Sequence, residues 1–172
     1  MPTIAIDHAP SQGAPVTTGC AVQHPAPCGV LVTPAALALP EVALLHERGA
    51  RIVVAGDTPV AMALAELALP GATRLWCNLR QSAEISRLHL DAQAEGPIDR
   101  LILAPSGEGP ADTLAIIRVV LAFLPALRAQ GRGEITLIPS DLASSATLTS
   151  FAEGMRPGLA GSGITLTVVP PI

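Results

Sequence analysis

From residue 28 to the end of the chain, short apolar segments alternate with segments of helical character. The strand segments show little alternation of apolar and polar residues, which is typical of strands buried on both faces of a parallel sheet. Because connections between parallel strands are right-handed, this order predicts the α/β class, with a doubly wound parallel sheet of about six strands. We expect strands at 29–33, 51–55, 73–77, 98–104, 134–138 and 164–169, and helices at 40–47, 61–69, from 82 onward, at 111–130 and at 142–155.

The segment 118–140 is the clearest of these strand and helix signals. Val119, Val120, Phe123 and Leu127 recur at spacings of three and four residues, which predicts one apolar stripe on a helix. The Gln-Gly-Arg-Gly sequence at 130–133 ends that helix, and a short hydrophobic strand follows it.

Composition limits the classes of protein to consider. The chain has 172 residues, 49% hydrophobic and 14% charged, which favours a globular domain over 28–172 after a Pro/Gly/Ala-rich arm at 1–27. Within the arm, 3–6 could add an edge strand. No apolar run reaches the roughly 18 residues of a membrane span, so the surplus of apolar surface favours a partner subunit. A net charge of -4, with two Phe, one Trp and no Tyr, argues against nucleic-acid binding.

The three cysteines, Cys20, Cys28 and Cys77, are odd in number, which favours a reducing, cytoplasmic compartment. The N-terminus has no basic region followed by an apolar core, so we expect no secretory signal. Cys20, His24 and Cys28 are evenly spaced, but structural zinc normally takes four ligands, so we predict no metal site. We expect Cys77, at the end of an apolar strand, to be an inert core thiol.

Five stretches of the sequence stand out together: HERGARIVVAG (46–56), CNLRQSAEI (77–85), PIDRLILAPSG (97–107), AFLPALRAQGRGEITLIPS (122–140) and LAGSGITLTVV (159–169). They resemble the short-chain dehydrogenase/reductase family, and the resemblance covers about 29–171. It implies a Rossmann-like sheet, a bound NAD or NADP, and catalysis by a Tyr, a Lys and a Ser.

The cofactor motifs of that family are altered in this chain. The family's first turn is a Gly-rich loop that lets backbone amides approach a pyrophosphate, whereas the turn at 33–40 has no glycine and two prolines. The segment 103–106, Leu-Ala-Pro-Ser, replaces the Asn-Asn-Ala-Gly expected after the fourth strand. Asp57 could hold a ribose hydroxyl or simply begin a helix, and Asn78 stands where an Asp usually faces the adenine. We therefore expect this chain to bind no cofactor, and NAD or NADP to be bound only by a partner subunit.

The catalytic motif of the family is also altered. Ser140 matches the family's Ser, but alignment places Asp141 and Ser145 at the Tyr and Lys positions, and the chain contains no Tyr and no Lys. A helix N-cap explains Ser140 and Asp141 more simply than a residual acid pair. His46 and His89 lie in expected helices, where packing or surface roles are the simplest interpretation.

The resemblance also implies which parts of the fold assemble with other subunits. The sequence stops at Ile172, before the family's substrate loop, C-terminal helix and seventh strand, so we expect a sheet that lacks them. The family usually forms a four-helix interface through the two helices that correspond to 111–130 and 142–156; alternatively, these helices only cover the sheet. The predicted interface residues are Ile116, Val119, Val120, Phe123, Leu127, Ala143, Ala146, Thr147 and Ser150.

Three hypotheses follow for the function. The first is a non-catalytic subunit that assembles with an active short-chain dehydrogenase/reductase, or with itself, without nucleic acid or membrane. The second is an enzyme of altered or residual chemistry that uses Ser140, Asp141 or Cys77. The third is a stand-alone scaffold or ligand-sensing module, since fold alone does not determine function.

Overall fold

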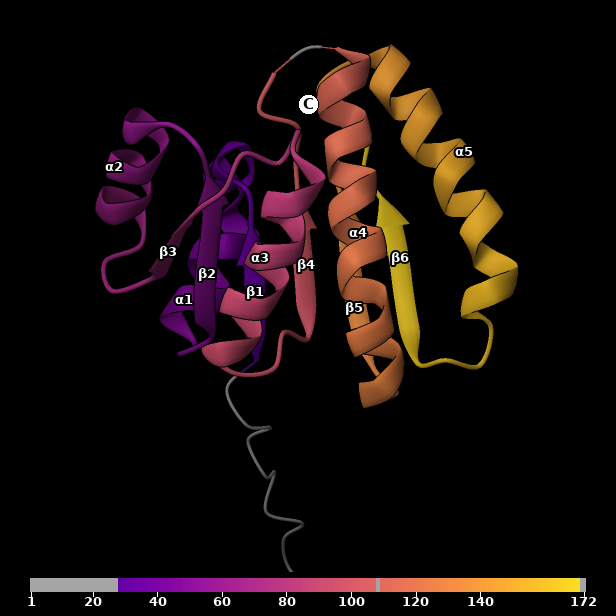
Figure 1. Ribbon diagram of the computed structural model, residues 1–172, viewed down its shortest axis with the longest axis horizontal. Helices are drawn as coiled ribbons and strands as arrows, with labels where there is room; N and C mark the ends of the chain where they lie inside the picture. Colours follow the sequence, from indigo (N-terminus) through magenta and orange to yellow (C-terminus); the bar gives the residue numbers. More distant parts are fainter. Residues whose placement is uncertain (1–27, 108, 171–172) are drawn as a thin grey trace, which may run out of the picture.

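A computed structural model describes residues 28–107 and 109–170, which form one six-stranded parallel sheet (Figure 1). The strand order is β3-β2-β1-β4-β5-β6, so the sheet is doubly wound about β1. The predicted fold class is therefore confirmed. The strands are β1 (Gly29–Val32), β2 (Arg51–Gly56), β3 (Thr73–Trp76), β4 (Arg100–Leu103), β5 (Gly133–Leu137) and β6 (Ile164–Val168).

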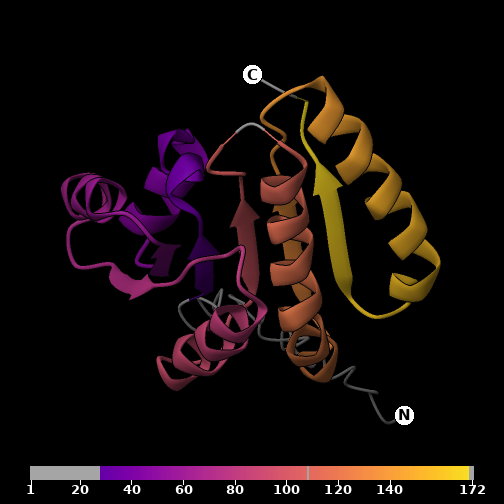
Figure 2. The ribbon, with the colours of Figure 1, turned by 45° about the horizontal axis from the view of Figure 1, so that its top comes forward.

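Helices cover both faces of the sheet. Helices α3 (Ser82–Ala94), α4 (Pro110–Gln130) and α5 (Leu142–Leu159) cover one face. The other face is covered by the short 3-10 helix η1 (Pro34–Ala38), α1 (Pro40–Glu47) and α2 (Pro59–Ala68). The turned view in Figure 2 shows the helices of this face apart from those of the first. The sequence pattern did not predict η1, and it ended α5 four residues too early.

The central strands are apolar on both sides, as the sequence predicted. All four residues of β1 are buried, and so are five of the six in β2. Leu31 faces the core beneath α3 and α4, whereas its neighbours Val30 and Val32 face the core beneath α1 and α2. Successive side chains of a strand point to opposite faces, so one strand contributes to two cores.

The two edge strands differ from this pattern. In β3 and β6, half-buried or buried residues alternate with exposed ones, and in β6 the exposed residues are Thr165 and Thr167. The expectation that all strands lack a period of two is therefore wrong at the edges, because each edge strand has a helix packed on one face only.

Helix α4 is long and apolar enough, by length and composition alone, to cross a membrane, contrary to the expectation from its sequence. Nine of its residues are nevertheless buried inside this fold. The stripe predicted from periodicity is among them, with Val119, Phe123 and Leu127 at most 1% exposed. Such burial is typical of a core helix of a globular domain, and Gly131 ends the helix in the left-handed conformation at φ 67°.

Several sequence-based expectations lie outside the described residues. These are the arm at 1–27 with the possible edge strand at 3–6, and Cys20 and His24, for which no metal site was predicted.

Candidate functional site

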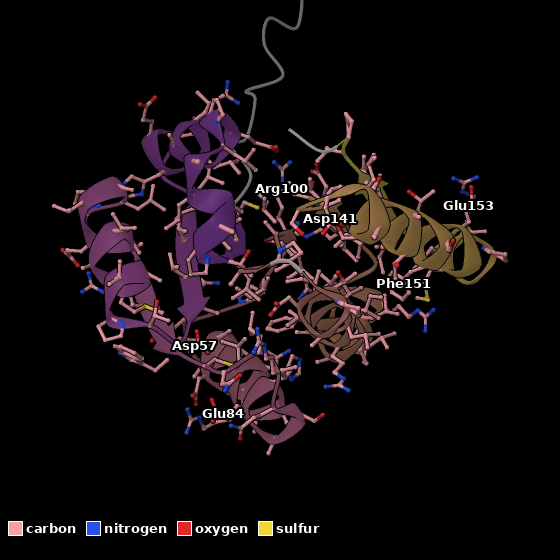
Figure 3. The ribbon with its side chains drawn as sticks, turned by 90° about the horizontal axis from the view of Figure 1, so that it is seen from above. Asp57, Glu84, Arg100, Asp141, Phe151 and Glu153 are labelled. Atoms are coloured by element: carbon pink, nitrogen blue, oxygen red, sulfur yellow. The ribbon has the colours of Figure 1, made fainter. Side chains whose placement is uncertain are left out.

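The candidate site lies along the carboxyl ends of the strands, where the loops after β1, β2, β3, β4 and β5 meet. Figure 3 looks down on this end of the sheet. In doubly wound sheets, ligands bind in the crevice outside the carboxyl ends, where the strand order reverses. Here the order reverses at β1, which pairs with β2 on one side and β4 on the other.

The loop after β1 is tied to the neighbouring strands by hydrogen bonds and by the packing of Pro34. Thr33 Oγ1 donates a hydrogen bond to the Ala104 carbonyl at 2.9 Å and accepts one from the Ala104 amide at 2.8 Å, which ties the ends of β1 and β4 together. Beyond Thr33 the chain turns at once into η1. A Cβ added to Gly56 would lie 2.7 Å from Pro34 Cγ, so Pro34 packs directly on the end of β2. Pro34 therefore occupies the space over the end of β2, while a hollow of about 300 Å³ remains between η1 and the start of α2.

A cavity of about 250 Å³ lies on the other side of β2, between the loops after β2 and β3 and the start of α4. It brings together Asp57 and Asn78, the two residues singled out from the sequence as possible cofactor contacts. Figure 3 places Asp57 at this part of the row of strand ends, with Glu84 of α3 nearby. The residues that line this cavity are Gly56, Asp57, Thr58, Cys77, Asn78, Leu79, Arg80, Ser106, Asp112, Ala115 and Ile116.

An ion pair forms one wall of this cavity. Arg80 Nε and Nη2 donate to the two oxygens of Asp112 at 2.9 and 3.0 Å, and this hydrogen bonding raises the pKa of the Arg80 guanidinium above its ordinary value. Asp112 is 9% exposed, in the first turn of α4, and a Cβ on Gly107 would lie 2.9 Å from its carboxylate. The pair was not predicted, because 32 residues separate its partners and neither stands in a recognisable motif.

The loop after β3 is held by local hydrogen bonds. The Asn78 amide donates to Glu84 Oε2 at 2.6 Å, and Asn78 Oδ1 accepts from the Arg80 amide at 3.0 Å. Cys77 is 2% exposed at the base of the cavity, and burial raises its pKa to about 11. Its thiol is therefore protonated at neutral pH, in line with the predicted inert core thiol.

The residues at the family's catalytic positions form a helix cap. Asp141 is the N-cap of α5: its Oδ1 accepts from the Ser144 amide at 2.6 Å, and its own amide donates to Ser144 Oγ at 2.9 Å. These hydrogen bonds, above all the one from the Ser144 backbone, hold the pKa of Asp141 below its ordinary value. Ser140 Oγ lies 3.5 Å from Asp141 Oδ2. The capping interpretation is confirmed for Asp141, which forms a capping box with Ser144, whereas Ser140 precedes the cap and contacts it only through its hydroxyl.

The catalytic-position residues and the cavity residues are separate. Figure 3 shows Asp141 well apart from Asp57 along the strand ends, and neither Ser140, Asp141 nor Ser145 lines the cavity beside Asp57. Asp141 instead borders a second hollow of about 200 Å³, between the starts of α4 and α5. Over 28–107 and 109–170, no group of three or more His, Cys, Asp or Glu side chains is arranged to hold a metal ion.

The predicted interface residues divide into two groups. Ile116, Val119, Val120, Phe123 and Leu127 are at most 1% exposed and pack under α4 against the sheet. Their assignment to an interface with a partner is therefore corrected: they are core residues, and no side-chain surface remains to contact another chain.

The other four predicted interface residues, Ala143, Ala146, Thr147 and Ser150, are exposed on α5. On α4 the outward apolar side chains are Leu114 and Leu121, each 47% exposed. The sequence pattern missed these two leucines, since it identified the strongest stripe of α4, which faces the protein's own core.

Among known proteins, similarity to this chain was found in structure and not in sequence. No family model matches the sequence, and no curated protein matches it either. A solved oxidoreductase of the short chain dehydrogenase/reductase family from Burkholderia thailandensis superposes with a TM-score of 0.68 at 22% identity, covering 85% of this chain and 69% of that one.

Two further solved structures give the same picture. The NADPH-bound short chain oxidoreductase from Pseudomonas aeruginosa PAO1, described as containing an atypical catalytic center, matches with a TM-score of 0.67 at 19% identity over 82% of this chain and 69% of that one. A short-chain dehydrogenase from Streptomyces avermitilis matches with a TM-score of 0.68 at 20% identity over 85% and 66%. This chain thus spans about two thirds of their length, and it has the fold of the short-chain dehydrogenase/reductases.

Proposed function

We propose that this chain is a non-catalytic subunit with the short-chain dehydrogenase/reductase fold. It assembles through the outward face of α4 and α5 with an active dehydrogenase or reductase of the same fold, and stabilises or shapes that enzyme. NAD or NADP is bound by the active partner only. The observation that carries the proposal is the use of Asp141, at the family's Tyr position, to cap α5.

The catalytic positions support this reading in chemical terms. General acid/base catalysis needs a group whose proton is available near neutral pH, and the family supplies it with a Tyr beside a Lys. This sequence has neither residue, and Asp141 has a lowered pKa and accepts hydrogen bonds from the start of α5. An ionised, capping carboxylate is a poor proton donor to a substrate carbonyl.

The turn after β1 also supports the proposal that this chain binds no dinucleotide. A pyrophosphate needs converging backbone N–H groups and room for the backbone to approach. Here Pro34 has no N–H and packs on Gly56, and the Ala36 amide donates to the Thr33 carbonyl within η1 at 3.0 Å. A dinucleotide bound in the family's manner would have to displace this packing.

The outward face of α4 and α5 suits a partner helix. Ala143, Ala146 and Thr147 are small and exposed, which permits close approach of another helix, and Leu114 supplies apolar surface beside them. The 200 Å³ hollow between the starts of α4 and α5 can receive a side chain of the partner. Such an interface would relate two similar subunits by approximate two-fold symmetry.

Co-expression with tagged short-chain dehydrogenases of the same genome, in the reducing cytoplasm where we expect the protein to act, tests the proposal. We expect co-purification with one of them, lost in an Ala146→Arg variant. Ala83→Arg, which makes the same change at an exposed position of α3, is the matched control and should leave capture intact. Failure to co-purify with any of them, or equal loss in both variants, would remove support for this face as the interface.

The cavity beside Asp57 supports a second candidate, a ligand-sensing module. At about 250 Å³ it lies just below the usual size of ligand pockets, and it offers an exposed carboxylate and the Asn78 amide around an apolar base. This chemistry suits a nucleoside without its phosphates. A rise in melting temperature with adenosine, lost in Asp57→Ala, would favour sensing, whereas a rise with NAD or NADP alone would contradict the expectation that the first turn binds no pyrophosphate. Turnover lost on Ser140→Ala would instead support an enzyme of altered chemistry.

A further inference from the structure

Strand β6 forms an open edge of the sheet. It pairs with β5 on one side, and no strand in the described part of the chain pairs with its other side. The Gly163 carbonyl and the Val169 amide both bond to β5. Because successive residues of a strand direct their N–H and C=O groups to opposite sides, the alternate residues between them direct theirs to the open edge. These residues are Ile164, Leu166 and Val168.

This edge lacks the features that keep strand edges from pairing. Natural edges carry charged side chains or proline, which discourage the addition of another strand. The opposite edge of the sheet, β3, has such a charge in Arg74, which pairs with Glu66 of α2. The sequence of β6 is Ile-Thr-Leu-Thr-Val, with neither charge nor proline. Of the two edges, β6 is therefore the one suited to accept a further strand.

A hollow lies beside this edge, on the face of the sheet that α5 covers. Its volume is about 280 Å³. Figure 1 and Figure 2 both show the last turns of α5 outward of β6, so a strand added at this edge would lie beneath them. The hollow is lined by the end of α5 and the start of β6, with Ala152, Arg156, Leu159, Ala160, Ile164, Thr165 and Leu166.

Residues 3–6 of the N-terminal arm have the alternation that this edge requires. In β6, apolar residues on the α5 face alternate with Thr165 and Thr167, which are exposed on the other face. The sequence Thr-Ile-Ala-Ile at 3–6 alternates in the same way. Residues directly opposite each other on neighbouring strands lie on the same face of a sheet. Ile4 and Ile6 can therefore enter the hollow under α5 while the smaller residues of the segment meet the two threonines.

The arm is long enough to reach this edge from its own chain. Cys28 directly precedes β1, and β4 and β5 lie between β1 and β6. At about 4.8 Å per strand, the position beyond β6 is about 19 Å from β1. The 21 residues at 7–27 connect the two, and a coil of that length spans about 25 Å on average. A tether that matches its span gives a roughly millimolar effective concentration, which favours the chain's own arm over a segment of another protein.

We propose that residues 3–6 pair with the open edge of β6 as an added, antiparallel strand. Cys28 and Ile164 both lie at the amino ends of parallel strands, so the antiparallel direction places Ile6, the residue nearest the tether, at that same end. The register that brings both isoleucines to the hollow pairs Ile6 with Ile164, Ala5 with Thr165, Ile4 with Leu166, and Thr3 with Thr167. Pro2 then lies opposite Val168 and, having no N–H, ends the ladder.

This strand is independent of the proposed assembly through α4 and α5. The small residues proposed to contact a partner, such as Ala143 and Thr147, lie in the first half of α5, whereas the hollow begins at Ala152. Ala146→Arg should therefore leave the added strand in place. Loss of the strand should in turn leave capture of a dehydrogenase unchanged.

Amide hydrogen exchange of the full chain, resolved by residue with NMR, is the first test. The Leu166 and Val168 amides should be protected in the wild type, because they donate to the added strand. Ile4→Asp should speed their exchange at least about tenfold, since it replaces an apolar side chain in the hollow by a charge. Val16→Asp, a similar change elsewhere in the arm, is the matched control and should leave both rates unchanged. The Thr167 amide, directed to β5, should exchange alike in all three proteins.

Covalent trapping is the second test, and it reports the register. Ala5 and Thr165 form a non-hydrogen-bonded antiparallel pair in this register, with Cα atoms about 4.5 Å apart, which a disulfide accepts. Under mild oxidation, Ala5→Cys combined with Thr165→Cys should link within one chain, and mass spectrometry should locate the bond at these positions. Ala9→Cys combined with Thr165→Cys is the matched control and should leave the cysteine at 165 unlinked.

Three results would overturn the proposal. The first is exchange of the Leu166 and Val168 amides that is as fast in the wild type as in Ile4→Asp. The second is protection that withstands Ile4→Asp, which would mean that another segment or protein covers the edge. The third is a disulfide that joins two chains and migrates as a dimer on a non-reducing gel, which would replace the chain's own arm by that of a second copy.

Discussion

The core position of Phe123 gives the sharpest test of how this fold is built. Its ring is 1% exposed beneath α4, and it contacts His89 of α3 edge-to-face with ring centroids 4.9 Å apart. The family resemblance instead assigned the same residue to an interface with a partner. A core residue stabilises the isolated chain, whereas an interface residue stabilises only the complex. Phe123→Ala therefore separates the two assignments in a single purified chain.

The magnitude follows from the burial. Truncating a fully buried Phe to Ala costs about 3–5 kcal/mol, through lost transfer free energy and the cavity left behind. The loss of the aromatic contact with His89 places the expected cost in the upper part of that range, since such pairs contribute about 0.5–1.5 kcal/mol beyond area burial. For a chain of this length, about 4 kcal/mol lowers the melting temperature by roughly 8–16 °C.

Urea unfolding followed by circular dichroism measures this free energy directly. The variant should show a lower midpoint at an unchanged slope, because the surface exposed on unfolding barely changes. Leu121→Ala is the matched control on the same helix: its side chain is 47% exposed, and we expect a cost of at most about 1 kcal/mol. If Phe123→Ala does not fold, the milder Phe123→Leu retains most of the volume and should cost less than about 1.5 kcal/mol.

A free energy of unfolding that changes by less than about 1 kcal/mol in Phe123→Ala would mean that α4 does not pack on the sheet as described. Equal losses in Phe123→Ala and Leu121→Ala would also contradict that packing, because the two side chains would then be equally buried.

Three further changes test other parts of the structure. Thr33→Val keeps the shape of Thr33 but leaves the Ala104 amide and carbonyl unpaired, so it should cost about 1–3 kcal/mol in urea unfolding, while Thr33→Ser retains the hydroxyl and should cost less. Gly163→Ala should destabilise strongly, because Gly163 has φ +72° and its added Cβ would lie 2.1 Å from a backbone oxygen, whereas Gly154→Ala, in open space within α5, should be neutral or stabilising by up to about 1 kcal/mol. The raised pKa of Cys77, about 11, keeps the thiol protonated at pH 7, so site-resolved alkylation should be slow there and should accelerate only as the pH approaches that value, provided the fold persists.

Much of the fold was predictable because local signals agreed with the global arrangement. The run Ile52-Val53-Val54-Ala55 has no polar position, and the strand it forms is buried on both faces. Thr58 and Pro59 signalled the start of a helix, and Thr58 caps α2 by accepting from the Ala61 amide at 3.2 Å. Such agreement between levels is expected of a sequence that specifies one structure.

What covers an apolar stripe was not predictable. Periodicity identifies an apolar face of α4, but the spacing of the apolar residues is the same whether that face packs on the chain's own sheet or on a partner chain. The stripe through Phe123 meets the chain's own sheet, while the outward Leu114 and Leu121 are too widely spaced to stand out in the sequence. The edge strand β6 was misread for a similar reason, since only the strand order shows which strands lie at an edge.

The residues of the candidate site were predictable only where a residue is positioned by the strand that it follows in the sequence. Asp57 comes directly after β2 and Asn78 two residues after the end of β3, so their common cavity follows from the parallel order of these neighbouring strands. The pair Arg80–Asp112 instead joins a loop to the start of α4, and no sequence spacing encodes that contact. Pairings of this kind depend on how the helices sit on the sheet.

The structure also explains how this fold can persist around an altered site. The cores beneath the two layers of helices are built from strand interiors and inward helix faces, such as Leu31, Leu101 and Leu127, each fully buried. The site residues lie instead in loops beyond the strand ends, where Asp57 and Ser140 are exposed. Substitutions there leave the apolar burial that stabilises the domain unchanged. The Thr33–Ala104 hydrogen bonds and the packing of Pro34 on Gly56 add cohesion where the family's loop would leave space for phosphates. In the proposed non-catalytic subunit, the loss of cofactor binding and the gain of local packing would arise from the same residues, so opening the first turn to make a phosphate site should lower the stability of the chain.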